Sequence, residues 1–125
     1  MGRVTIDVVT YDPKTDSHKM ILVEEGPWET SAILDNLRAL QERLYNCVDA
    51  AVDGHVAERF PDSKGKDIAI QLDCYDTPED VAPLFERFAN HIRSSAEVEA
   101  DMKRQGFVRA IRFQYNRRSL KGQDA

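Results

Sequence analysis

The sequence predicts an α+β domain in which helices pack on one face of a small four-stranded mixed sheet. Four segments alternate apolar and polar residues, as strands do, and three others repeat apolar residues every three or four positions, as helices do. The expected order is strand, strand, helix, strand, helix, short helix, strand. A tight turn joins the first two strands, and helices lead to the later ones, so right-handed crossovers should place all helices on one face.

The predicted strands are residues 3–11, 18–24, 67–75 and 109–115. Between the first two, Pro13 and its neighbouring aspartates supply turn chemistry, so these strands should form a hairpin. Residues 20–23 (Met-Ile-Leu-Val) are apolar on both faces, which a strand with one solvated face does not need. We therefore expect the hairpin to be covered on its outer face. A homodimer through the hairpin would cover the apolar strip that Val9, Met20 and Leu22 would otherwise leave in water.

The helices are predicted from their caps and their apolar faces. Thr30 or Ser31 should begin a long helix that Gly54 ends, and Thr77, followed by Pro78, should cap a second. A shorter helix runs from about Ser95 to Gly106, with Phe107 expected to fold back on the helix. The expected core consists of Ile6, Leu37, Leu40, Leu44, Ile68, Ile70, Leu72, Leu84, Phe85, Phe88, Ile92, Ile111 and Phe113.

The chain has 125 residues, enough for one domain, which we expect over residues 1–116 with a disordered basic tail at 117–125. Apolar stretches are too short to span a bilayer, and a secretory h-region is lacking, so we expect a cytoplasmic protein that does not enter membranes. Cys47 and Cys74 are expected to be reduced and buried. The cysteines and histidines do not fall at metal-ligand spacing, so neither a metal nor a cofactor is expected.

The charge is unevenly distributed along the chain. The net charge is −5, yet residues 103–121 contain seven cations and no acid, whereas residues 1–102 contain ten cations and 21 acids. Exposed ion pairs contribute little to stability, so folding alone does not account for such a cluster. We expect Arg109, Arg112, Arg117 and Arg118 to bind a protein partner with an acidic surface, although neutralisation of the acidic first helix is the alternative.

Several short motifs also resemble a known family. They are Ile6-Asp7, Trp28, Leu40-Gln41-Glu42-Arg43-Leu44, Asp53-Gly54, Phe60-Pro61 and Lys64-Gly65-Lys66. Over residues 4–75 the chain resembles a family of small bacterial cytoplasmic domains of unknown function. The resemblance implies a fold and a cellular setting, and it implies no catalytic residue.

The sequence is compatible with three function classes. The leading one is a non-catalytic interaction module, immunity-like or an adaptor, with Trp28 as either an interface anchor or a core residue. The second is nucleic-acid binding through the basic C-terminal segment, but the alternation places Phe113 and Tyr115 on the face opposite Arg112. The third is an enzyme in which Asp7, Asp73 and Arg112 converge on the open sheet face.

Overall fold

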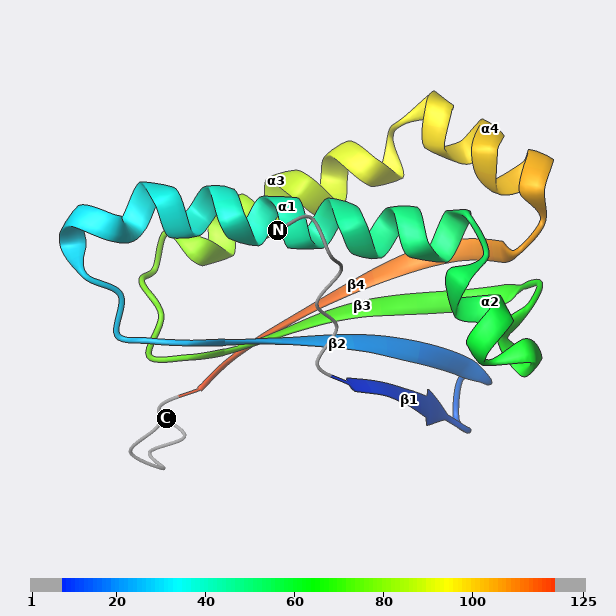
Figure 1. Cartoon of the computed structure of the whole chain (residues 1–125), viewed down its shortest axis with the longest axis horizontal. Coiled ribbons are helices and arrows are strands. Elements are labelled where there is room, and N and C mark those ends of the chain that lie inside the picture. The colour runs from blue at the N-terminus through cyan, green and yellow to red at the C-terminus, as the bar shows by residue number, and fades with distance from the viewer. Residues whose placement is uncertain (1–7, 119–125) are drawn as a thin grey trace.

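The structure is a computed structural model that describes residues 8–118. Its four strands form one sheet in the order β1-β2-β3-β4 (Figure 1). Strand β1 (Val8–Asp12) pairs antiparallel with β2 (Ser17–Glu25), and β3 (Lys66–Tyr75) and β4 (Val108–Arg118) add in parallel. The sheet is therefore mixed, as the sequence predicted.

The helices all lie on one side of this sheet (Figure 1). The helical elements are η1 (Thr30–Ala32), α1 (Ile33–Val52), α2 (His55–Arg59), η2 (Pro61–Ser63), α3 (Val81–Arg93) and α4 (Ala96–Gln105). The first crossover, from β2 to β3, contains α1, and the second, from β3 to β4, contains α3 and α4. The α+β class with helices on one face is thus confirmed.

The strand register sorts the residues onto two faces. Met20, Ile70 and Phe113 are aligned across β2, β3 and β4 on the face that the helices cover. Their neighbours Ile21, Gln71 and Gln114 are aligned on the opposite face, because successive strand residues point to opposite sides. We call this second face the open face, since no helix of residues 8–118 covers it (Figure 1).

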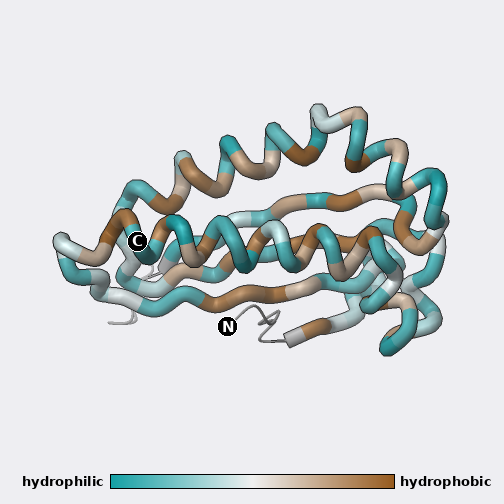
Figure 2. The backbone as a smooth tube through the Cα atoms, turned by 45° about the horizontal axis from the view of Figure 1, so that its top comes forward, coloured by the Kyte–Doolittle hydropathy of each residue, from teal (hydrophilic) through white to brown (hydrophobic). Residues whose placement is uncertain are grey.

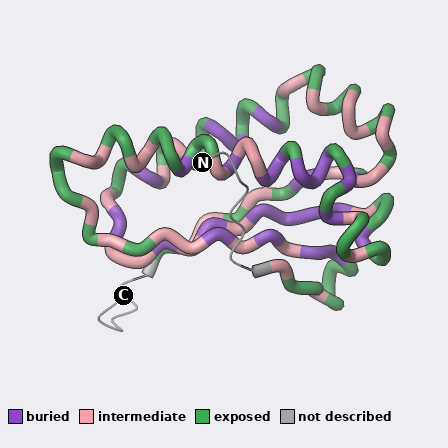
Figure 3. Tube along the Cα trace, in the orientation of Figure 1, coloured by how far each residue is buried: buried purple, intermediate pink, exposed green. Residues whose placement is uncertain are grey.

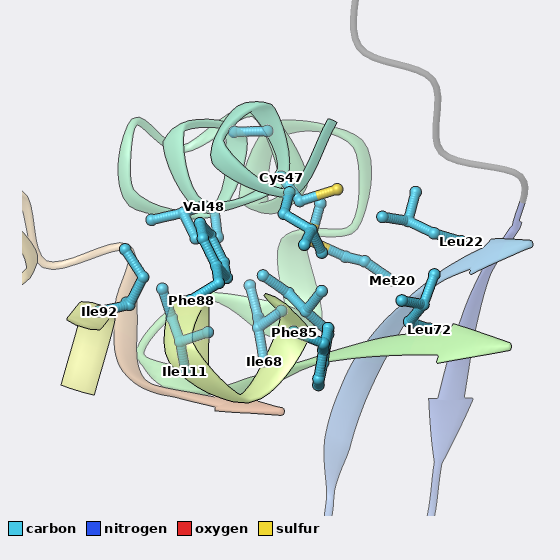
Figure 4. Packing of buried hydrophobic residues seen from close by; sticks show 14 of the residues in the cluster. Met20, Leu22, Cys47, Val48, Ile68, Leu72, Phe85, Phe88, Ile92 and Ile111 are labelled. Atoms are coloured by element: carbon cyan, nitrogen blue, oxygen red, sulfur yellow. The ribbon is translucent and has the colours of Figure 1, made fainter. Parts of the chain in front are cut away.

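The core lies between the sheet and the helices. Burial is concentrated in β2, β3 and the second half of α1 (Figure 3), and apolar residues line these segments (Figure 2). Figure 4 shows side chains of α1, α3 and the sheet meeting in this layer. The predicted core residues found buried are Leu40, Leu44, Ile68, Ile70, Leu72, Phe85, Phe88, Ile92 and Ile111. Leu37, Leu84 and Phe113 pack against them partly buried, and Ile6 is outside the described residues.

The hairpin differs from what the sequence suggested. Met20 and Leu22 were expected to leave an apolar strip in water, but both side chains are 0% exposed and belong to the core beneath the helices. On the open face the apolar residues of β2 are Ile21 and Val23, which are half-buried. The reason given for a hairpin dimer therefore does not hold for Met20 and Leu22.

The sequence predicted both ends of α4 correctly but placed the start of α3 too early. Ser95 caps α4 as expected, accepting a hydrogen bond from the Val98 N–H at 3.2 Å, and Gly106 ends it with a φ of 72°. Thr77 does not cap α3, which begins at Val81. Pro78 lies in the turn that precedes the helix, so the first helical turn comes later than the local pattern indicated.

Gly54 follows the end of α1 with a φ of 91°, as predicted, but the start of α1 departs from local expectation. A 3₁₀ turn over Thr30–Ala32 precedes α1, and neither that turn nor α1 has a side-chain cap, so Thr30 and Ser31 do not serve as caps. Phe107 lies against Gly54, which follows α1.

Strand β4 is longer than expected. The strand was expected to end at residue 115 and continues through Arg118, and residues 119–125 are outside the described part. Within residues 8–118, none of the helices has the length and apolar composition needed to cross a membrane.

Candidate anion-binding site on the last strand

The structure brings Arg109 and Arg112 together on the carboxylate of Asp67. Arg109 donates from Nε to Oδ1 at 2.8 Å. Arg112 donates from Nε to Oδ2 at 3.0 Å, and its Nη2 lies 2.9 Å from the same oxygen. The Asp67 side chain is only 7% exposed, whereas the side chains of Arg109 and Arg112 are 71% and 65% exposed. A buried carboxylate thus holds two exposed guanidinium groups, and we call these three residues the arginine pair site.

A β-bulge explains how two arginines reach one carboxylate. Residues three apart in a regular strand point to opposite faces, so Arg109 and Arg112 should diverge. The register shifts here, because Lys66 is aligned with Val108 while Ile68 is aligned with Ile111. The extra residue in β4 at this point changes the phase of the strand, and both arginines can then approach Asp67.

The charges of the site support one another. The Arg109 hydrogen bond lowers the pKa of Asp67 most, burial acts in the opposite direction, and Arg112 lowers it further. The same contact with Asp67 raises the pKa of Arg109. The ionised forms of Asp67 and Arg109 are therefore favoured. Because the carboxylate has two guanidinium partners, the site has an excess of positive charge at the surface.

The arginine pair site still has donors to offer. A guanidinium carries five N–H donors, and the contacts with Asp67 involve Nε of Arg109 and Nε and Nη2 of Arg112. The remaining donors belong to exposed groups whose orientation Asp67 already fixes. Such donors suit a carboxylate or phosphate, which a guanidinium can hold through two parallel hydrogen bonds.

The other two expected arginines lie elsewhere. Arg117 is aligned with Cys74, near the opposite end of β4, and its Nη2 donates to the Thr77 carbonyl at 3.1 Å. Arg118 is aligned with Tyr75, and its side chain is outside the described part. The four arginines that were expected to bind a partner together are therefore divided between the two ends of β4.

The acidic candidates on the open face do not meet Arg112. Asp73 is aligned with Asn116, and it accepts hydrogen bonds from Asn116 Nδ2 at 2.9 Å and from Gln71 Nε2 at 3.0 Å. Arg112 is aligned with Ala69, farther along the sheet. Asp7 is outside the described residues. The partners of Asp73 are thus neutral amides, and they do not form an acid and base pair with it.

The remaining candidate residues, one tryptophan and two cysteines, lie in or against the hydrophobic core. Trp28 is half-buried and packs against the hydrophobic core. Cys47 and Cys74 are buried thiols, as expected. Burial raises the pKa of the Cys74 thiol, while the neighbouring hydroxyls of Thr77 and Tyr115 oppose that effect. Among residues 8–118, His, Cys, Asp and Glu side chains do not form a group of three that could hold a metal.

Fold and site together define a small α+β domain with an arginine pair anchored on its last strand. The chain belongs to a family of unknown function (DUF6572), which matches residues 2–105. Neither a curated protein nor a solved structure matches the chain. The family match is longer than the resemblance over residues 4–75, and it includes Asp67 but ends before Arg109 and Arg112.

Proposed function

We propose that this protein is a non-catalytic interaction module that binds the acidic surface of a protein partner through the arginine pair site. The observation that supports this most is the contrast in exposure between Asp67, at 7%, and the arginines it holds, at 71% and 65%. One arginine would neutralise the buried carboxylate, so the second adds charge that folding does not require. An adaptor or immunity-like role in the bacterial cytoplasm is part of the proposal.

Preorganisation strengthens the argument for binding. A free arginine side chain loses rotamer freedom when it binds, which weakens the interaction. Here Asp67 restrains both guanidinium groups before any partner binds. The negative charge of its carboxylate also offsets the repulsion between the two guanidinium groups. A partner carboxylate would therefore meet donors that are held in place and carry a local excess of positive charge.

The surroundings of the site favour a protein over a nucleic acid. Single-stranded nucleic acids bind through cations together with aromatic rings on which bases stack. Phe113 and Tyr115 face the helices, where both rings contact Phe85 and Phe113 also contacts Phe88. These rings do not share a face with Arg112. The net charge of −5 also opposes general attraction to a polyanion.

The proposal can be tested with a labelled decaglutamate peptide and a labelled single-stranded DNA 20-mer, each followed by fluorescence anisotropy at low and at raised salt. The test variant is Asp67→Asn, Arg109→Gln and Arg112→Gln together, because amides at all three positions leave no buried charge unpaired. The control, Arg38→Gln with Arg59→Gln, removes two exposed cations from α1 and α2.

We expect the peptide to bind in a salt-sensitive manner, with at least a tenfold loss of affinity in the triple variant and little change in the control. Circular dichroism melting curves should show that both variants are folded. Equal losses in the two variants, or an absence of peptide binding to the native protein, would show the proposal to be wrong. Tighter binding of DNA than of peptide through the same residues would replace it with nucleic-acid recognition.

A further inference from the structure

Strand β4 forms one edge of the sheet. It is the last strand in the order β1-β2-β3-β4 and has 11 residues, so its outer side has no strand partner within residues 8–118. Backbone N–H and C=O groups along such an edge can pair with another extended chain. This edge also carries the arginine pair site.

Two grooves run beside β4 on the face that the helices cover, the first with a mainly apolar lining and the second with a mixed polar and apolar lining. The first, of about 610 Å³, lies between β4 and the helices α3 and α4, and Ile92, Met102 and Ile111 form part of its wall. The second, of about 510 Å³, lies between α3 and β4, and Phe85 and Phe113 form part of its wall. Both grooves would lie beneath alternate side chains of a strand added to this edge.

Arg93 lies where the two grooves adjoin. It lines both of them, and its guanidinium carbon is 5.4 Å from the centre of the Phe113 ring. Lys103 and Arg109 also line the first groove, where Glu99 is the acid, and Glu86 is the acid of the second. The first groove therefore combines a mainly apolar wall with cations close to the strand edge, and the second places aromatic rings beside polar side chains.

An added strand would meet different chemistry on its two faces. Its side chains directed toward the helices would enter the two grooves, where apolar ones would contact Ile92 and Met102 in the first and the Phe85 and Phe113 rings in the second. The alternate side chains would lie on the open face, beside Arg112 and Gln114, which share that face of β4. A segment that alternates apolar and acidic residues would satisfy both faces at once.

We propose that the partner is an extended segment of alternating acidic and apolar residues, which adds to β4 as a fifth strand of the sheet. Its backbone pairs with the free edge, its acidic side chains meet the arginine pair site, and its apolar side chains fill the grooves. This inference rests on the proposed function, because it assigns a binding mode to the same site.

Charge argues against a second copy of this chain as the occupant. Residues 108–118 contain four arginines and no acid. If two β4 strands paired with each other, arginines would lie opposite arginines or neutral residues in every register, and like charges directly opposite each other are destabilising. An acidic segment has the complementary charge.

The test uses labelled ten-residue peptides, so the protein itself is unchanged and remains folded. The probe is five Glu-Val repeats, and its control has five glutamates followed by five valines. Two further versions carry N-methyl groups either on all valines or on all glutamates. Alternate N–H groups of a strand point to the same edge, so only one of these two versions blocks the edge that faces β4.

We expect the alternating peptide to bind at least fivefold more tightly than the block control. One N-methylated version should lose at least tenfold in affinity, while the other changes little, and amide hydrogen exchange in β4 should slow on binding. Equal effects of the two N-methylated versions, or no preference for alternation, would overturn strand addition. Decaglutamate binding that still depends on Arg109 and Arg112 would in that case leave the proposed function standing.

Discussion

The ring of Phe107 lies against the α-carbon of Gly54, so closely that a Cβ atom on Gly54 would be 2.7 Å from Cε2 of Phe107. Gly54 joins α1 to α2, and Phe107 directly precedes β4. The Phe107 carbonyl also accepts a hydrogen bond from the Gly65 N–H at 2.9 Å. One residue thus ties the start of β4 both to the end of the first helix and to the turn before β3.

The first prediction is that Gly54→Ala destabilises the protein more than Gly65→Ala. Both glycines have positive φ, 91° and 78°, so alanine is strained at either position. Gly65 has no atom within 4 Å of a built Cβ, whereas Gly54 faces Phe107. We expect Gly54→Ala to lower the free energy of unfolding by about 1–3 kcal/mol more than Gly65→Ala, because overpacking adds to strain.

Urea unfolding of both variants provides the measurement. Adding Phe107→Ala to Gly54→Ala should recover part of the loss, because the clash is then removed. Similar losses in Gly54→Ala and Gly65→Ala would mean that the contact with Phe107 is unimportant for stability.

The second prediction concerns the core between α1 and α3. Phe88 contacts Tyr45 edge-on, with ring centroids 4.8 Å apart, and Leu40 is 1% exposed. Truncation of either residue to alanine should cost about 2–5 kcal/mol of unfolding free energy, since a cavity remains. Leu34→Ala is the control, because Leu34 is 69% exposed on the same helix as Leu40, and it should change the value by less than about 0.5 kcal/mol.

The third prediction is a pH dependence at Asp67. Its pKa is lower in the folded state than the value of about 3.9 expected when unfolded, so its ionised form stabilises the fold above that pH. The stabilisation is lost as the pH falls through the folded pKa. Asp67→Asn should therefore lower the melting temperature at pH 6, and the difference from the native protein should shrink below about pH 4.

Asp49 offers a control of opposite sign. Burial and the nearby Asp53 raise the pKa of Asp49, so its ionised form disfavours the folded state. Asp49→Asn should leave the melting temperature at pH 6 unchanged or higher. If Asp67→Asn behaved in the same way as Asp49→Asn, the two arginines would not be stabilising the Asp67 carboxylate.

The fourth prediction is that both thiols resist modification. Cys47 and Cys74 are 0% exposed, and burial raises the pKa of Cys74. The thiolate is the reactive form, so an aromatic disulfide reagent at pH 8 should label neither cysteine in the folded protein within minutes. Both should react at once in 6 M guanidinium. Rapid labelling of one thiol without denaturant would show that the core opens locally.

Local patterns predicted the fold well where one periodicity dominates. Ile68, Ile70, Leu72 and Cys74 alternate strictly and are all buried on the helix-covered face of β3. Local patterns did not predict the structure where the pairing of two strands determines which residues face the helices. Residues 20–23 are apolar throughout, and the sequence could not say which of them the helices would cover. Only the register with β3 assigns Met20 and Leu22 to the core.

The candidate site was predicted only in part, for a related reason. The run of cations identified Arg109 and Arg112, but a strict alternation places them on opposite faces. The bulge beside Lys66 arises from pairing with β3 and has no local periodic signal. Asp67 was missed as well, because it begins a strand and looks like an ordinary polar end. One signal could have identified Asp67. It is an acidic residue in a strand that was expected to lie in the same sheet as the basic last strand.

The agreement between sheet order and chain order has a consequence for synthesis. Each described strand pairs with the strand that the ribosome produced before it, so a nascent chain can extend its sheet in one direction as it emerges. Strand β4 is the last to join. Until residues 108–118 have left the exit tunnel, Asp67 lacks both of its arginines, so the arginine pair site cannot form before the last strand of the sheet has been made.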